Sequence, residues 1–331
     1  MVSERQSLVL AVDGGQSSTL ALVADEGGHI LGAGLAGPSN HVHEPGGMAR
    51  LSDALRRSIT AALQQAGREA GDVVSACLGM TGGPQEAREI ARRLLPAATV
   101  EAYQDVVTAL AGASCAQPGV VVIAGTGSVA YGRLGDGREA KAGGWGYIMG
   151  DEGSGYDIGR AALRAATQAA DGRSAPTPLL DRVPAHFGFP DLVALHRAIY
   201  AGEVARPRLA ELTAVVAEAA RAGDAVAQAI LAQAGRDLAS AALAVITRLG
   251  HRQTGLTTYY TGGVFRAGAP VLEPFRHALQ AGSPRSDVRP AAFSPVVGGL
   301  FLALQAAGHA LTGERLRAIE ATLPPPAISK T

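Results

Sequence analysis

The sequence predicts an α/β protein made of two copies of one domain, and three observations support this prediction. The chain has 331 residues, of which 47% are hydrophobic, so it is long enough for two domains with separate cores. Short apolar runs end repeatedly in glycine-rich turns, a pattern typical of buried strands. The first block of such runs recurs when the chain is shifted by 111 positions, which places Gly14 on Gly125.

Charge and cysteine content exclude several classes of protein. The 29 basic and 29 acidic side chains balance, and only 18% of residues are charged, which argues against nucleic acid or an acidic membrane as a partner. The two cysteines, Cys77 and Cys115, cannot build a disulfide framework or a zinc site. The apolar run that starts at Leu8 is too short for a signal peptide or a membrane span. We therefore expect a cytoplasmic globular protein with no nucleic acid and no membrane as a partner.

The first copy begins with three strands and continues with alternating helices and strands. Short apolar segments separated by Asp/Gly turns predict an antiparallel meander over residues 8–12, 19–24 and 29–35. Apolar residues at helical spacing predict a long helix over 46–66. The remaining expected elements are a strand at 73–80, a helix at 85–94, a strand at 100–103 and a helix at 106–115.

The second copy repeats this beginning and is enlarged by helices. Strands are expected at 119–124 and 129–134, and the constant shift pairs Val12 with Ile123, Ser17 with Ser128, and Asp25 with Asp136. The other expected elements are helices within 152–170 and 209–249, a loop at 171–178, a strand at 257–261, and terminal helices at 295–307 and 312–323. The expected domains are therefore 1–115 and a larger second domain of 116–331.

Glycine makes up 43 of the 331 residues, about 13% against an average of ~7%, and the glycines cluster at strand ends. Consecutive backbone N–H groups in a turn form a nest for phosphate oxygens, and a carboxylate beside it can hold Mg²⁺ through water. The first hairpin combines both features, although an ordinary glycine turn is the alternative. Its candidate nucleotide ligands are Asp13, Gly14, Gly15, Gln16, Ser17, Ser18 and Thr19, with Asp13 as the metal ligand.

A second glycine hairpin supports the hypothesis that the chain binds a nucleotide. Gly125, Thr126, Gly127 and Ser128 repeat the nest, with Ala124 where the first hairpin has Asp13. Two such loops and one metal carboxylate suit one nucleotide clamped from both sides. Neither loop is a GxxxxGK[ST] phosphate loop, and neither opens a dinucleotide-binding βαβ unit.

A third glycine turn follows the late strand. Gly262, Gly263 and Val264 are small enough to let an adenosine lie against the backbone, and a plain strand-to-helix turn is the alternative.

These turns together resemble those of the actin-like ATPase superfamily. Five motifs carry a closer resemblance: Asp13-Gly14-Gly15, Ser39-Asn40-His41, Gln104-Asp105, Gly125-Thr126-Gly127-Ser128 and the block from Gly143 to Ser154. By these motifs the chain resembles, from about Leu8 to Gly308, the N-acetylglucosamine kinase branch of the benzoyl-CoA reductase-type ATPase family. The resemblance implies duplicated actin-like (ribonuclease H-like) domains flanking a nucleotide and sugar cleft, ATP and Mg²⁺ as cofactors, and a homodimer.

The resemblance also implies roles for single residues. Asp105 is the candidate general base, because sugar phosphorylation needs a carboxylate near the reacting hydroxyl; a helix cap before Val106 is its structural alternative. Asp151 could instead be a helix cap or a second base, and Trp145 could simply pack in the core. The candidate sugar ligands are Asn40, Asp105, Gly127, Ser128, Gly144, Trp145 and Asp151. His41, His43 and Glu44 are expected in a solvated loop rather than at a metal.

Three functions remain in competition at this point. The first is ATP-dependent phosphorylation of N-acetylglucosamine to its 6-phosphate, with glucosamine, N-acetylmuramate and glucose as other substrates. The second is an ATPase that activates a dehydratase or reductase through an iron–sulfur cluster, but Cys115 is too far before the second hairpin to match that group. The third is a sugar-sensing transcription regulator, which would need a helix-turn-helix segment for which we expect no room before Leu8.

Overall fold

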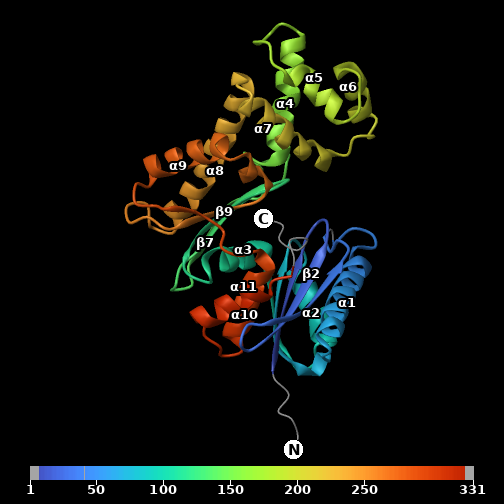
Figure 1. The fold of residues 1–331 in the computed structure, drawn as a ribbon, viewed down its shortest axis with the longest axis vertical. Helices are drawn as coiled ribbons and strands as arrows, with labels where there is room; N and C mark the ends of the chain where they lie inside the picture. Colours follow the sequence, from blue (N-terminus) through green and yellow to red (C-terminus); the bar gives the residue numbers. More distant parts are fainter. Residues whose placement is uncertain (1–6, 41, 325–331) are drawn as a thin grey trace, which may run out of the picture. The chain divides into compact units, whose positions relative to one another are not determined.

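A computed structural model describes residues 7–40 and 42–324, with the side chain of Arg206 left aside. It divides into two compact units, one formed by Met1–Gln117 with Ala291–Thr331 and the other by Pro118–Pro290 (Figure 1). The first boundary lies close to the expected one. The expectation that the chain from 291 onwards belongs to the second domain is wrong, because the described part of this segment, 291–324, packs on the first unit.

The first unit contains a five-stranded sheet in the order β3-β2-β1-β4-β5. The first three strands form the expected antiparallel meander, and β4 and β5 join in parallel. The strands are β1 Leu8–Gly14, β2 Thr19–Asp25, β3 Ile30–Ala36, β4 Val73–Met80 and β5 Thr99–Gln104. The parallel strands β1, β4 and β5 therefore end at one edge of the sheet, where ligands of open α/β sheets usually bind.

Helices cover both faces of this sheet, because its central strand is apolar on both sides. Leu8 and Leu10 of β1 pack towards α1, while Val9 and Ala11 belong to the core that contains α10. Figure 1 shows α1 and α2 on one face and α10 on the other. The helices are α1 Gly47–Ala66, α2 Pro84–Leu94, α3 Asp105–Ser114, α10 Pro295–Ala306 and α11 Gly313–Thr322, with a 3₁₀ turn at Ala70–Asp72.

Backbone contacts explain why the C-terminal segment returns to the first unit. A side chain at Gly298 of α10 would overlap the carbonyl of Thr108 in α3, and one at Gly112 of α3 would overlap the carbonyl of Ser294. The two helices therefore cross with almost nothing between them, and the apolar α10 is buried against α3, β1 and β4.

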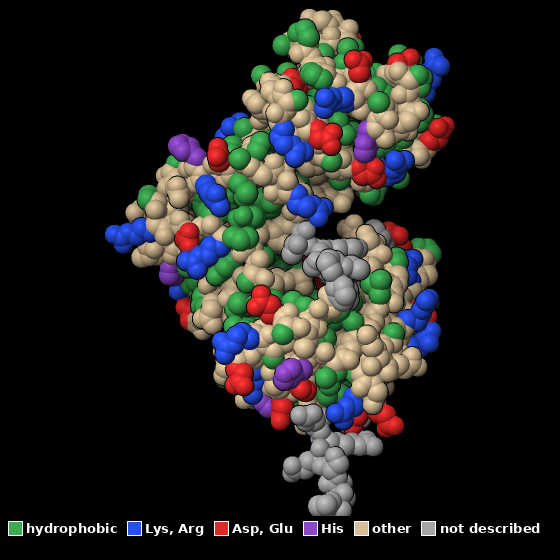
Figure 2. Space-filling view, viewed as in Figure 1, with side chains coloured by type: hydrophobic (Ala, Val, Ile, Leu, Met, Phe, Trp, Pro, Cys, Tyr) green, Lys and Arg blue, Asp and Glu red, His purple; other side chains and the backbone are tan. Residues whose placement is uncertain are grey.

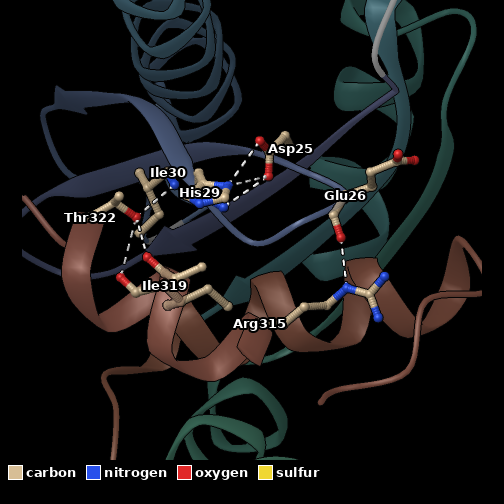
Figure 3. Close-up of polar contacts among 8 residues, drawn as sticks. Asp25, Glu26, His29, Ile30, Arg315, Ile319 and Thr322 are labelled. Carbon is tan, nitrogen blue, oxygen red and sulfur yellow. Dashed lines mark hydrogen bonds and ion pairs between the residues drawn. The ribbon is translucent and has the colours of Figure 1, made fainter. Parts of the chain in front are cut away.

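The last helix is tied to the β2–β3 turn by polar contacts (Figure 3). The Arg315 guanidinium donates to the carbonyl of Glu26 at 2.7 Å, and Thr322 Oγ1 accepts the backbone N–H of Ile30 at 2.9 Å. These contacts attach α11 to the edge of the first sheet.

The second unit repeats the strand arrangement of the first. Its sheet runs β8-β7-β6-β9-β10, which has the same pattern of three antiparallel and two parallel strands. The predicted duplication is therefore confirmed, although β8 and β10 were not anticipated. The strands are β6 Gly119–Ala124, β7 Ser128–Arg133, β8 Glu139–Gly143, β9 Thr258–Thr261 and β10 Val288–Pro290.

The constant shift of 111 positions is wrong beyond the first strand of each copy. Gly14 pairs with Thr19 across the first hairpin, while Ala124 pairs with Ser128 across the second, so the second turn is shorter. The expected equivalences of Ser17 with Ser128 and of Asp25 with Asp136 fail, because register in a hairpin depends on turn length.

Helices fill the rest of the second unit. The expected helical region 209–249 consists of η2, α7 and α8, and α8 is apolar enough in composition to cross a membrane. Its buried residues, such as Leu231 and Leu238, belong instead to the core of this unit. The helices are α4 Gly155–Ala170, α5 Leu179–His186, α6 Leu192–Tyr200, η2 Arg206–Glu211, α7 Leu212–Arg221, α8 Ala225–Arg248, η3 Gly263–Ala267 and α9 Ala269–Gly282. On the face shown in Figure 2, basic and acidic side chains are interspersed.

Candidate functional site

The first glycine hairpin lies at the end of β1, and its tip is open to solvent. Gly15 N–H donates to the carbonyl of Ser18 at 3.0 Å, which closes the turn, while Gln16 and Ser17 are exposed. A Cβ at Gly14 would lie 2.6 Å from Ser39 Oγ, so a larger residue there would require the side chains of Ser39 and Met80 to move. Thr19 is fully buried, and its hydroxyl donates to the carbonyl of Gly37 at 2.9 Å, so this side chain is bonded inside the protein.

Asp13 precedes this turn on β1 and is half-buried between Leu20 of β2 and Gly79 of β4. Within residues 7–40 and 42–324, no three His, Cys, Asp or Glu side chains form a metal cluster. A single carboxylate beside a phosphate nest nevertheless suits Mg²⁺, which keeps most of its ligands as water and phosphate oxygens.

Asp105 is connected to the first hairpin through Thr81, a residue that sequence reasoning did not select. Thr81 N–H donates to the carbonyl of Gly14 at 2.9 Å, and Thr81 Oγ1 donates to Asp105 Oδ2 at 2.9 Å. The only sequence signal for Thr81 was its place directly after a buried strand. Asp105 is the first residue of α3, and the N-cap is Gln104, so the alternative that Asp105 caps this helix is wrong.

Asn40 lies near the same hairpin. Ser39 N–H donates to the carbonyl of Gly15 at 3.2 Å, and the Arg50 guanidinium donates to the carbonyl of Asn40 at 3.0 Å. Asn40 itself is half-buried, and His43 in the following turn is exposed. His41 lies outside the described residues.

In the second unit, the β6–β7 hairpin is bonded to the segment that leads into α4. Asp151 Oδ1 accepts the backbone N–H of Ser128 at 3.2 Å, and Ser128 Oγ donates to the carbonyl of Glu152 at 2.8 Å. Gly155 N–H donates to the carbonyl of Gly125 at 2.8 Å, so the positive end of the α4 dipole faces this hairpin. The N-cap of α4 is Ser154, so the cap alternative for Asp151 is also wrong.

The carboxyl group of Asp151 has an unusual environment. Burial raises its pKa above the ordinary value, the nearby charges of Glu152 and Asp157 raise it further, and the bond from Ser128 N–H opposes them. Its backbone lies in the left-handed region at φ 62°, which is uncommon for a residue other than glycine.

The third glycine turn packs directly on the second hairpin. A Cβ at Gly262, where φ is 108°, would overlap the carbonyl of Ala124 at the end of β6. Beside this contact is a cavity of about 480 Å³ that opens between the hairpin and the wall formed by η2 and α7. It is lined by Gly125, Thr126, Gly155, Pro207, Ala210, Glu211, Thr213, Ala214, Ala217, Arg221, Gly263, Val264, Arg266 and Ala267. The residues from η2 and α7 were not predicted, because small side chains at helical spacing look like ordinary core.

Gly144 and Trp145 follow β8 beside the same hairpin. Gly144 N–H donates to the carbonyl of Ser128 at 2.9 Å, which holds the start of the loop. Trp145 is 71% exposed, so the alternative that it packs in the core is wrong. Tyr147 instead anchors the loop, with its ring 5.4 Å from that of Tyr156.

The cysteines do not suit an iron–sulfur cluster. Cys77 is buried in the core within β4, where its thiol is not open to a cluster, and burial raises the pKa of that thiol to about 12. Cys115 caps the C-terminus of α3, and burial raises its pKa as well.

The structure thus gathers the predicted residues into two groups. Asp13 to Ser18, Asn40 and Asp105 lie together in the first unit, with Thr81. Gly125 to Ser128, Gly144, Asp151 and Gly262 to Val264 lie together in the second.

Comparisons with known proteins find relatives that match most of the chain. The chain is 30% identical to the N-acetylmuramic acid/N-acetylglucosamine kinase of Clostridium acetobutylicum, covering 85% of this chain and 92% of that protein. It is 25% identical to the N-acetyl-D-glucosamine kinase of Dictyostelium discoideum, covering 90% and 98%.

A solved structure shares the fold along almost the whole chain. It is a provisionally assigned N-acetylglucosamine kinase from Chromobacterium violaceum, with a TM-score of 0.70 and 30% identity, covering 91% of this chain and 100% of that one. Residues 10–303 match the model of one ATPase family. The chain belongs to the BadF/BadG/BcrA/BcrD ATPase family.

Proposed function

We propose that the protein is an ATP-dependent amino sugar kinase that converts N-acetylglucosamine to N-acetylglucosamine 6-phosphate. Relatives named as kinases of N-acetylglucosamine, N-acetylmuramic acid or glucosamine support the amino sugar class. Glucosamine, N-acetylmuramate and glucose are the competing substrates. We also propose that the protein is cytoplasmic and, as the family resemblance implies, a homodimer; sedimentation of the purified protein would test the dimer.

The observation that carries the proposal is the cavity beside the second hairpin. Its volume of about 480 Å³ is in the range of small-ligand sites, and it has a phosphate-type turn on one wall and the Gly263-Val264 turn on another. We propose that the adenosine of ATP occupies this cavity and that its phosphates extend over the Gly125–Ser128 turn towards the positive end of α4.

Asp13 would hold Mg²⁺, which when bound neutralises charge on the phosphates during transfer. The first hairpin would bind the phosphates through the N–H groups of its exposed residues, Gln16 and Ser17. Asp13→Ala should weaken calorimetric binding of ATP in the presence of Mg²⁺ and leave binding without Mg²⁺ nearly unchanged. ATP binding by Asp13→Ala that equals wild-type binding in the presence of Mg²⁺ would remove Asp13 from the metal site.

Asp105 would act as the general base. It accepts the proton of the sugar hydroxyl as that oxygen attacks the γ-phosphorus and the bond to ADP breaks. The hydrogen bond from Thr81 holds the carboxylate at the end of β5, next to the first hairpin. Asn40 and Asp151 would bind sugar hydroxyls, since recognition of hydroxyls needs donors and acceptors of fixed position.

The decisive experiment is a panel of the four sugars with ATP and Mg²⁺. ADP release would be followed by coupled assay, and the phosphorylated position identified by phosphorus–proton NMR. We expect the highest kcat/KM with N-acetylglucosamine and a product phosphorylated at position 6. No sugar-dependent ADP release with any of the four would overturn the proposed function.

A further inference from the structure

Ser128 uses its donors within the protein. Its backbone N–H is bonded to the Asp151 carboxylate, and its hydroxyl is bonded to the carbonyl of Glu152. Its own carbonyl accepts the N–H of Gly144. A side chain with these bonds and little exposed surface is poorly placed to be a direct ligand of ATP or sugar.

The same bonds make the second hairpin and the Asp151 segment a single structure. Besides the two from Ser128, the carbonyls of Gly125 and Thr126 accept N–H groups from the first turn of α4, at 2.8 and 3.2 Å. A Cβ at Gly127 would lie 2.9 Å from Asp151 Oδ2, so the carboxylate rests against the turn itself.

The left-handed backbone of Asp151 needs such support. This conformation costs free energy for a residue with a side chain, so it persists only where surrounding contacts determine it. The hydroxyl of Ser128 holds the carbonyl of Glu152, the residue that follows Asp151, and the next residue, Gly153, packs on Leu238 of α8.

We propose that Ser128 is a positioning residue that holds Asp151 in place for the sugar. This proposal rests on the proposed function, since it concerns the same sugar site. The consequence is that loss of the Ser128 hydroxyl weakens sugar binding without removing any atom that touches sugar or nucleotide.

Nearby negative charges make the Asp151 carboxylate sensitive to the loss of its bond from Ser128 N–H. Asp151 faces Glu152 on its own segment and Asp157 on α4, and these two also face Asp237 on α8. The bond from Ser128 N–H favours the ionised carboxylate against these like charges. If the segment loosens, that bond weakens and the pKa of Asp151 rises further.

The test compares Ser128→Ala with Ser128→Thr, which keeps the hydroxyl, and with Ser154→Ala as a matched control. Ser154 is on the same segment, and its hydroxyl accepts only the N–H of Asp157 among the contacts described. For Ser128→Ala we expect the sugar KM to rise about tenfold, as for one lost hydrogen bond, with the KM for ATP within about twofold. Ser128→Thr should restore the sugar KM, and Ser154→Ala should lower the melting temperature while leaving the sugar KM close to wild type.

A second readout does not depend on turnover. The carboxyl carbon-13 signal of Asp151 is identified by its loss in Asp151→Asn. Its titration midpoint should move to higher pH in Ser128→Ala and stay at the wild-type pH in Ser154→Ala. An unmoved titration, an unchanged sugar KM, or an equal rise in the KM for ATP would each overturn the positioning role. If wild type phosphorylates no sugar, the proposed function fails, and the titration alone decides whether Ser128 positions Asp151.

Discussion

The β1–β2 hairpin of the first unit and the β6–β7 hairpin of the second hold the same place in sheets of the same strand pattern. Around the first, the neighbours of Gly14 are the side chains of Ser39 and Met80. Around the second, the neighbours are other loops, with Gly262 against Ala124 and the Asp151 carboxylate against Gly127.

This difference bears on the two tasks that we propose for the duplicated turn. The first copy keeps a carboxylate, Asp13, at the end of its strand, where it can hold a cation. The second has Ala124 there, and the backbone of the Gly262 turn packs on it. The carboxylate of the second copy is instead supplied by Asp151, from a segment that follows β8. Under the proposed function, the first hairpin serves the metal and catalysis, and the second serves the nucleotide and the sugar.

The largest expected effect concerns the carboxylates tied to each hairpin. Asp105→Asn keeps a partner for Thr81 but removes the proton acceptor, so kcat should fall by about 10²–10⁴ with sugar and ATP binding nearly unchanged. Asp151→Asn should mainly raise the sugar KM. Turnover and calorimetric binding measured side by side check this assignment, and a large kcat loss in Asp151→Asn alone would reverse the two roles.

The next effect tests the crowding of the second turn. Gly127→Val would drive a side chain into the Asp151 carboxylate, so we expect both ATP and sugar titrations to lose affinity, by about 2–4 kcal/mol for displaced contacts. Gly125→Ala is the control for folding, because a Cβ there meets nothing within 4 Å. Its melting temperature should stay near wild type. A folded Gly127→Val protein that binds ATP normally would contradict the phosphate assignment.

A smaller effect, in the first unit, should distinguish sugar binding from nucleotide binding. Asn40→Ala removes a half-buried amide beside the hairpin, and we expect sugar binding to weaken by about 1–3 kcal/mol while ATP affinity stays unchanged. Isothermal titration with each ligand alone measures both. Unchanged sugar affinity would place the sugar site elsewhere.

The smallest effect is on stability and depends on pH. Because the pKa of Asp151 is raised in the folded protein, the folded state binds this proton more tightly than the unfolded chain, whose Asp pKa is ~3.9. The ionised carboxylate therefore costs stability at neutral pH, and this cost disappears as the pH falls to that value. Asp151→Asn should raise the melting temperature at pH 7 and have less effect near pH 4, since Asn tolerates the left-handed backbone. A gain that grows in acid would contradict the sign of the shift.

The turns and strand ends of the candidate site could be located from the sequence, because their signals are local. Glycine at the ends of apolar runs marks where a backbone turns sharply, as at Gly14 and Gly262, and an acidic residue directly after a strand marks Asp105. The strand periodicity likewise determined the meanders and therefore the duplication.

Only the tertiary structure decided what those local features meet. Periodicity shows that α10 has buried faces but not that they pack on the first unit, and composition could not tell that Trp145 is exposed. The link from Gly14 through Thr81 to Asp105 joins three strand ends, and the bond between Ser128 and Asp151 joins residues on separate segments. The physical reason is that a side chain's partner depends on how distant segments pack, which the pattern of neighbouring residues does not encode.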